Sequence, residues 1–245
     1  LFVSDGTAVG TYKMSDNILN PAQFVAGSTD TADPWVYFTA SSNQNSNRSL
    51  YVTNGQQGVA GIASGFTGIT SGNFFNQNLI NVGGVIYFAG RDNINAQNES
   101  LYKFDINAGN GMQPVKIITG TGTGNAYSYV ISLYHLNGNL YFNVYDAVSA
   151  KYQLWKSDGT STGNVLLKDN LYSNNYFNGN GTIYFTGSDI NGSELWKTDG
   201  TANGTILVKD IMPGRNSAIP TIFAYTNNNI LFAASDAVNG RELWK

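Results

Sequence analysis

The stretch ELWKTDGT, residues 194–201, recurs in varied form along this chain of 245 residues. Its other copies are LFVSDGT at 1, LYVTNGQ at 50, LYKFDIN at 101 and LWKSDGT at 154. The turns of the five copies lie near positions 5, 54, 105, 158 and 199, so they are spaced by 41 to 53 residues. Self-similarity at a period of about 20–50 residues is the signature of stacked or ring-shaped repeat architectures.

A second marker is an apolar run that ends in an aromatic residue. Its five copies are WVYFTAS at 35, VIYFAGRD at 85, NLYFNVYD at 139, TIYFTGSD at 182 and NILFAASD at 229. Short β-branched and aromatic runs between Gly, Asn and Asp predict four strands per unit, in the clearest unit at 174–179, 182–187, 193–198 and 204–210. Four antiparallel strands repeated five times predict an all-β fold, a five-bladed β-propeller, with an open β-solenoid as the alternative.

The two ends of the chain indicate how the ring would close. The chain begins with LFVSDGTAVGTYKM, the third and fourth strands of a unit, and ends with the first strands of another unit at ELWK. We therefore expect one domain, 1–245, whose last blade combines N- and C-terminal strands, because this leaves no exposed sheet edge. Both 1–3 and 243–245 match the third-strand position, so one copy is redundant, displaced, or the start of something outside the ring.

Composition excludes several classes of function. The net charge is −3 with a pI near 5.0, and the 13 Lys and Arg residues are scattered, so we expect no nucleic-acid partner. No apolar run reaches the roughly 18–20 residues of a membrane span. The chain has no cysteine, one histidine, and neither the H-E-x-x-H nor the P-loop motif. Residues 159–163 match G-x-S-x-G, but they lie in the repeated DGTxxG turn and not between a strand and a helix. We therefore predict no enzymatic activity.

The repeated phrase also carries a family resemblance. ELWKTDGTANGT at 194–205 and QLWKSDGTSTGN at 153–164 resemble the ELWxxDGTxxGT repeats of bacterial extracellular and cell-surface proteins. Residues 212–245 resemble the PG, S-x-P and D-x-x-x-G-x-ELW elements of that family, whereas the units at 50 and 101 depart from it. The resemblance implies export in a bacterium of the Bacteroidetes type and supplies no catalytic residue.

Three columns of residues are candidate ligand sites. The first column lies seven residues before the marker aromatic, on the innermost strand, and is either a wet channel lining or a ring that holds a small polar ligand. It comprises Thr31, Asn81, His135, Asn178 and Tyr225.

The second column lies four residues after the same aromatic and comprises Ser42, Asp92, Asp146, Asp189 and Asp236, with Glu194 and Glu242 nearby in sequence. These oxygens either bind Ca²⁺ or stabilise their own turns. Each blade offers only one or two oxygen donors, whereas Ca²⁺ needs about six to eight. We therefore assign no metal site.

The third column holds Trp155, Trp196 and Trp244, which either stack on sugar rings or pack between blades. Phe2, Tyr51 and Tyr102 fill the same position in other units, which favours packing. Irregular insertions at 41–49, 91–100 and 119–128 are either recognition loops or ordinary surface loops.

These observations together predict a non-catalytic, secreted or cell-surface binding or adhesion module that recognises carbohydrate or another surface component. Its predicted ligand-binding residues are Asn81, His135, Asn178, Tyr225, Trp155 and Trp196. The alternative is a structural scaffold subunit that contacts only protein in an envelope assembly. An enzyme such as a polysaccharide lyase or glycosidase would need a cluster of acidic and basic groups that the repeats do not contain.

Overall fold

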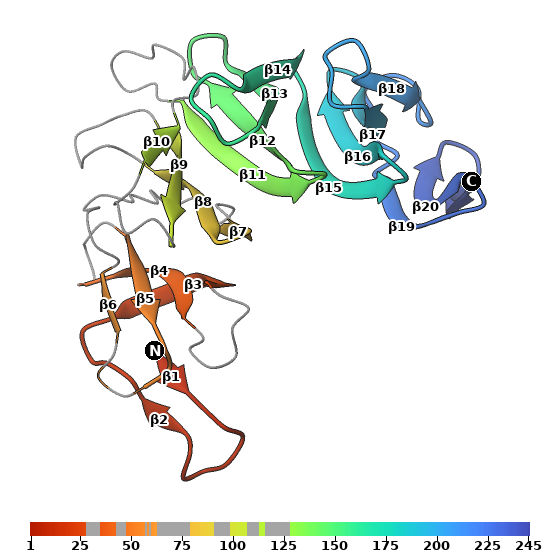
Figure 1. Ribbon diagram of the computed structural model, residues 1–245. Coiled ribbons are helices and arrows are strands. Elements are labelled where there is room, and N and C mark those ends of the chain that lie inside the picture. Colours follow the sequence, from red (N-terminus) through yellow and green to blue (C-terminus); the bar gives the residue numbers. More distant parts are fainter. Residues whose placement is uncertain are drawn as a thin grey trace. The chain divides into compact units, whose positions relative to one another are not determined.

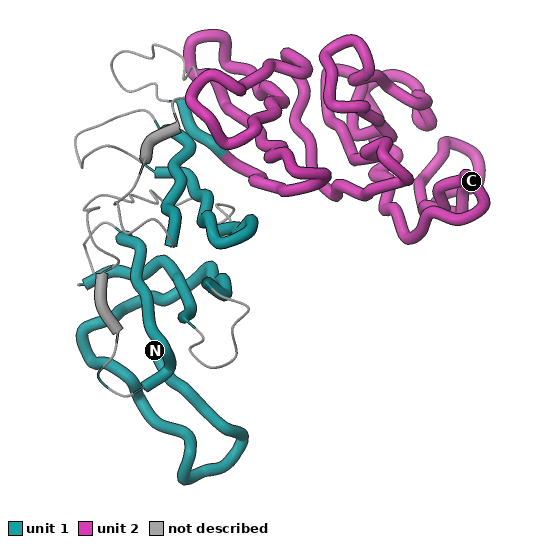
Figure 2. The backbone as a smooth tube through the Cα atoms, in the orientation of Figure 1, with its two compact units in different colours: residues 1–130 teal, residues 131–245 magenta. Residues whose placement is uncertain are grey.

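The computed structural model describes residues 1–27, 35–42, 48–56, 58, 60–62, 79–90, 99–106, 113–115 and 128–245. It consists of two compact units, Leu1–Val130 and Ile131–Lys245 (Figure 2). The elements of both units are β-strands (Figure 1). The described part of the chain contains no helix of the length and hydropathy needed to cross a membrane.

The first unit holds an N-terminal hairpin and two four-stranded antiparallel sheets. In the hairpin, β1 (Phe2–Val3) pairs with β2 (Tyr12–Lys13). The first blade is β3 (Leu19–Ala26), β4 (Val36–Ser41), β5 (Ser49–Thr53) and β6 (Ala60–Ile62); the second is β7 (Ile80–Val82), β8 (Val85–Gly90), β9 (Ser100–Asp105) and β10 (Gln113–Val115).

Three further blades follow in chain order, and all but the first two residues of β11 belong to the second unit. The third blade is β11 (Tyr129–Leu136), β12 (Asn139–Asp146), β13 (Lys151–Ser157) and β14 (Asn164–Asp169). The fourth is β15 (Tyr172–Gly179), β16 (Thr182–Asp189), β17 (Gly192–Thr198) and β18 (Ile206–Lys209), and the fifth is β19 (Thr221–Thr226), β20 (Asn229–Asp236) and β21 (Gly240–Trp244).

Five successive antiparallel meanders define the fold class as an all-β, five-bladed β-propeller. The strands expected at 174–179, 182–187, 193–198 and 204–210 correspond to β15–β18, with ends that differ by a few residues. This agreement has a physical cause. Gly and Asn at the turns, such as Asn180 and Gly181 with positive φ, fix where each strand ends.

The marker aromatics form the centre of each blade. Phe38, Phe88, Phe142 and Phe185 are almost completely buried on the second strands. The hydrophobic clusters join neighbouring blades, because Leu154 and Leu167 of the third blade pack with residues of the fourth blade. Both faces of an inner strand are therefore covered, as the run of apolar residues predicts.

The DGTxxG part of the repeat is a turn that closes on itself. Asp199 Oδ1 accepts hydrogen bonds from Thr201 N, at 2.9 Å, and from Thr201 Oγ1, at 2.7 Å. Thr201 Oγ1 in turn accepts from Gly204 N at 2.9 Å, and a Cβ at position 204 would collide with the Asp199 carboxylate. The same bonds and the same collision occur at two further copies, Asp5–Thr7–Gly10 and Asp158–Thr160–Gly163.

The N-terminal hairpin packs on the first blade as one blade packs on the next. Tyr12 OH donates to Gly55 O at 2.8 Å, and a Cβ at Gly55 would lie 3.9 Å from Val3 Cγ2. The corresponding turn glycine of the fourth blade, Gly200, faces Lys156 of the third blade in the same way. The hairpin thus stands where a preceding blade would place its third and fourth strands.

The fifth sheet has three strands among the described residues, because β21 pairs with β20 and occupies the third position. Both copies of the third-strand phrase form strands, β1 near the N-terminus and β21 near the C-terminus. Pairing between the N-terminal hairpin and β21, and with it a single domain over 1–245, stays a prediction.

Candidate functional site

The two junctions of the second unit differ in the length of the linker. Between the fourth and fifth blades, residues 210–220 connect β18 to β19. This long linker lies directly on the start of β17, where a Cβ at Gly192 would collide with Asn216 O. Between the third and fourth blades the linker is only residues 170–171.

The long linker is held by the glutamate of the ELW phrase. Glu194 is 1% exposed, and its carboxylate accepts hydrogen bonds from Ile211 N at 2.9 Å and from Ala218 N at 3.2 Å. Ser193 N donates to Ser217 Oγ at 3.0 Å. Burial raises the pKa of Glu194, although these backbone hydrogen bonds oppose the rise. At the junction of the fourth and fifth blades, the backbone of the linker therefore covers the start of β17.

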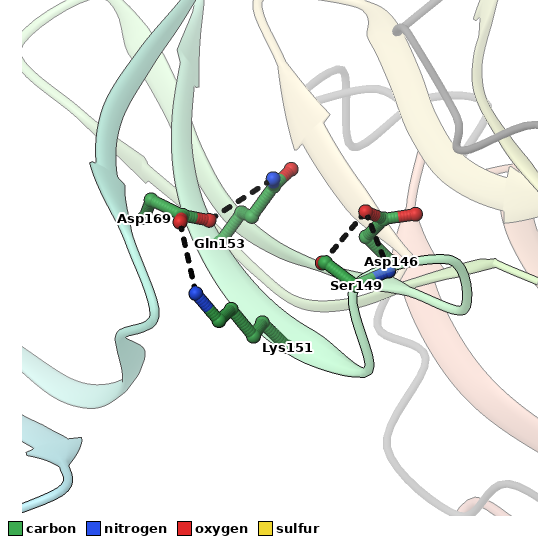
Figure 3. A network of polar contacts seen from close by, with 5 residues as sticks. All are labelled: Asp146, Ser149, Lys151, Gln153 and Asp169. Carbon is green, nitrogen blue, oxygen red and sulfur yellow. Dashed lines mark hydrogen bonds and ion pairs between the residues drawn. The ribbon is translucent and has the colours of Figure 1, made fainter.

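The short linker leaves the corresponding part of the third blade uncovered. Strand pairing places Lys151, Tyr152 and Gln153 on β13 where β17 has Gly192, Ser193 and Glu194. Asp169 accepts a hydrogen bond from Gln153 Nε2 at 3.2 Å and forms an ion pair with Lys151 Nζ at 3.6 Å (Figure 3). At the start of β13, Lys151, Gln153 and Asp169 therefore contact one another, whereas the start of β17 is covered by the linker 210–220.

A cleft of about 360 Å³ lies beside this uncovered strand end. Its volume is near the lower end of the range for small-molecule sites, about 300–1,000 Å³. We call it the tyrosine cleft, and its lining residues are Tyr152, Asn170, Tyr172, Ser188, Asp189 and Ile190.

Three tyrosines form a row that ends in the cleft. The rings of Tyr145 and Tyr152 meet edge to face with centroids 5.2 Å apart, and those of Tyr152 and Tyr172 meet at 5.1 Å. Tyr172 OH lies 3.3 Å from Ser132 Oγ. Both lining tyrosines are half-buried, so the row is fixed by packing while part of each ring remains accessible.

The aspartates of the second column serve their own turns. Asp146 accepts from Val148 N at 3.2 Å and from Ser149 Oγ at 2.7 Å, and Asp189 accepts from Asn191 N at 2.7 Å. Partial burial acts to raise the pKa of Asp146, but these hydrogen bonds outweigh it and lower the pKa.

These contacts are the turn geometry that the sequence offered as the alternative to Ca²⁺ binding. Among the residues that the structure describes, no three His, Asp or Glu side chains gather in a way that could hold a metal ion. Asp92 lies outside the described residues.

The inner column connects neighbouring blades. Asn81 Nδ2 donates to Ala26 O at 2.6 Å and to Gly27 O at 3.0 Å, both at the end of β3. Asn178 Nδ2 donates to Asn137 Oδ1, at 3.1 Å, in the hairpin of the third blade. The amides expected to face a ligand are thus engaged with the preceding blade.

The remaining members of that column differ from one another. His135 Nε2 is buried and has no hydrogen-bond partner among the described residues, and burial lowers the pKa of the imidazole. The Tyr225 ring lies against Gly179, where a Cβ would be 2.9 Å from the ring, and its OH is 3.3 Å from Asn228 Oδ1. Thr31 lies outside the described part of the chain.

The tryptophans pack between strands, which is the alternative to sugar stacking that the sequence offered for them. Trp155 is 7% exposed and Trp196 is 5% exposed, so neither ring presents a face to a ligand. Trp155 Nε1 donates to Gln153 Oε1 at 3.1 Å, and Lys168 Nζ lies 5.7 Å from the Trp196 ring centre. The same lysine–tryptophan contact recurs with Lys209 at 5.3 Å from Trp244.

Sequence reasoning missed the tyrosine cleft, although a signal for it was present. The spacing of 41 residues between the turns at 158 and 199 is the shortest of the four, and the short linker 170–171 lies within it. Tyr145 and Tyr152 also replace Ser188 and Ser193 of the next blade. Most of the insertions at 41–49, 91–100 and 119–128 lies outside the described residues.

No family profile matches the chain, and no curated protein matches it by sequence. Among solved structures, it is similar to a prolyl endopeptidase, with 14% identity, a TM-score of 0.46, and coverage of 82% of this chain but only 29% of the other. It is also similar to an endo-arabinase from Bacteroides thetaiotaomicron, with 12% identity, a TM-score of 0.37, and coverage of 94% of both chains.

A third similar structure is the catalytic domain of the Coprinopsis cinerea GH62 α-L-arabinofuranosidase, with 12% identity and a TM-score of 0.40, covering 95% of this chain and 92% of the other. Similarity at this level says nothing about what this chain binds or catalyses. The assignment of the fold rests on the strand pairing described above.

Proposed function

We propose that this chain is a non-catalytic binding module of the bacterial cell surface or exterior, of the ELWxxDGTxxGT-repeat type, and that it recognises carbohydrate through the tyrosine cleft. The observation that carries the proposal is the break in the repeat between the third and fourth blades. There the linker shrinks to residues 170–171, and tyrosines line the space that remains.

The chemistry of the cleft supports a sugar as its ligand. A pyranose ring has an apolar face of C–H groups, which packs on aromatic rings such as those of Tyr152 and Tyr172. Its hydroxyls need donors and acceptors at the rim, and Asn170, Ser188 and Asp189 supply both. Ile190 is 63% exposed and adds apolar surface at the edge of the cleft.

A glycan array probed with labelled protein, once with Ca²⁺ and once with EDTA, tests the proposal. We expect saturable binding that survives EDTA, because the Asp146 and Asp189 carboxylates already accept hydrogen bonds from their own turns. Binding that is lost in EDTA would reinstate the calcium hypothesis for the aspartate column. A blank array in both conditions would refute carbohydrate recognition.

Variants then locate the site. Tyr172→Ala removes a cleft ring, and we expect it to abolish array binding while the thermal unfolding transition stays cooperative. Phe223→Ala is the control, because this aromatic is 58% exposed on the inner strand β19 and lies outside the cleft. Equal binding by wild type and Tyr172→Ala would place recognition elsewhere on the chain.

One observation favours the second candidate, a scaffold that contacts only protein. The turns that connect the second and third strands of three successive blades each expose an aliphatic side chain, and exposed apolar groups that recur on one face suit a protein contact. These are Val148, Ile190 and Val238, with exposed fractions of 65%, 63% and 87%. A scaffold would give a blank array and would be retained by a partner from the native envelope in a pull-down.

A further inference from the structure

We infer that the tyrosine cleft selects uncharged sugars and rejects acidic ones such as uronic acids. This inference rests on the proposed function and adds the ligand class. It follows from the arrangement of charges around the cleft, which the repeat alone does not determine.

The cleft carries negative charge only. Its six lining residues include one carboxylate, Asp189, and no lysine or arginine. Protein sites for sugar acids instead present a cation, usually an arginine whose fork matches a carboxylate. A uronate bound here would bring its own negative charge next to Asp189 without a positive partner.

The lysine next to Tyr152 in the chain faces a different carboxylate. Lys151 lies next to Tyr152 in the chain, but its Nζ forms an ion pair with Asp169 at 3.6 Å, and Gln153 holds the other oxygen of that carboxylate (Figure 3). Asp146 is the cross-strand partner of Lys151 at the turn end of the same hairpin. The ionisable side chains at this hairpin turn and around the cleft are one positive, Lys151, and three negative, Asp146, Asp169 and Asp189, so they sum to −2.

Asp189 keeps one oxygen able to serve a neutral ligand. Its Oδ1 accepts from Asn191 N at 2.7 Å, whereas its Oδ2 has only a 3.5 Å contact with Asn191 Nδ2. A carboxylate oxygen accepts strong hydrogen bonds from sugar hydroxyls. The same group thus attracts a hydroxyl-rich neutral ring and repels an anionic one.

The experiment compares matched ligands on the intact chain. The probes are pairs of oligosaccharides of equal length and equal linkage that differ only in a carboxylate for a hydroxymethyl group, for example β-1,4-linked mannose and β-1,4-linked mannuronate. We expect the wild type to prefer the neutral member of a bound pair by roughly tenfold or more, because like charges a few ångströms apart repel at a protein surface.

Asp189→Asn is the decisive variant, because asparagine still accepts the turn hydrogen bond while the charge is removed. We expect it to reduce the preference for the neutral ligand severalfold or abolish it. The matched control is Asp236→Asn at the equivalent turn of the fifth blade, whose aspartate accepts from Val238 N at 2.9 Å and which should leave the preference unchanged.

The outcomes separate this inference from the proposed function. Tighter binding of the acidic member, lost in Tyr172→Ala, would overturn the charge selectivity while carbohydrate recognition at the cleft stands. A preference that Asp189→Asn leaves intact would overturn the role of this carboxylate. No binding of either member of any pair would overturn the proposed function and the inference together.

Discussion

One buried amide hydrogen-bonds the third blade to the fourth, which predicts a large effect for a small substitution. Asn143 is fully buried on β12, and its Nδ2 donates to Ser173 O of β15 at 2.7 Å. Its Oδ1 accepts from Ser173 N at 2.9 Å and from Ser173 Oγ at 3.0 Å. Replacement by alanine leaves a buried backbone N–H and a buried C=O without partners.

The expected cost follows from these two groups. An unsatisfied buried polar group costs about 1–3 kcal/mol, so Asn143→Ala should lower the free energy of unfolding by about 3 kcal/mol. For a chain of this size that corresponds to a fall in Tm of about 6–12 °C. Thr186 occupies the equivalent position and donates one bond to Pro220 O at 2.7 Å, so Thr186→Val should cost about 1–2 kcal/mol.

Urea denaturation followed by tryptophan fluorescence measures both variants against the wild type. Asn143→Ala should cost more than Thr186→Val, because it leaves two backbone groups without hydrogen-bond partners and Thr186→Val leaves only one. A cost below about 1 kcal/mol for Asn143→Ala, with an unchanged m-value, would refute the claim that this amide joins the two blades.

Three further predictions concern the repeated phrase. Gly204→Ala should lower Tm because its Cβ collides with Asp199, and the loss should vanish when Asp199→Ala is also present; a loss that persists in the double variant contradicts the turn account. Burial raises the pKa of Glu194 above its ordinary value of 4.5, so the wild type should lose stability relative to Glu194→Gln as the pH rises from 4.5 through that raised pKa. The measurement is the Tm of both proteins from pH 4 to 8. A difference in Tm that stays constant over this range contradicts the prediction. Lys168→Ala should cost about 0.5–1 kcal/mol by losing its contact with Trp196, and should change tryptophan fluorescence, whereas no change in either measurement would show that the contact contributes nothing.

The blades could be predicted from sequence because their signals are local. The aromatic of each marker run, such as Phe142, is buried at the centre of its blade, and the Asp-Gly turns mark strand ends. The function of Glu194 could not be predicted in this way. Its partners, Ile211 and Ala218, are 17 and 24 residues away along the chain, and the repeated phrase does not indicate which residues bind it.

The candidate site was missed for the opposite reason. Repeats draw attention to residues that recur, such as Trp155 and Trp196, and these prove to be core residues. The tyrosine cleft consists of residues that do not recur, and it lies where the linker is short. Only the shortened spacing before position 199 indicated that the junction differs, and spacing alone does not say which side chains fill the gap.

The central claim is that the chain binds carbohydrate at the tyrosine cleft and not along the inner column. Calorimetric titration of the strongest array ligand into two variants, Tyr152→Ala/Tyr172→Ala and Asn178→Ala, tests it most directly. The account predicts that the double variant loses binding whereas Asn178→Ala keeps the wild-type dissociation constant. Loss of binding in Asn178→Ala with full binding by the double variant would contradict it.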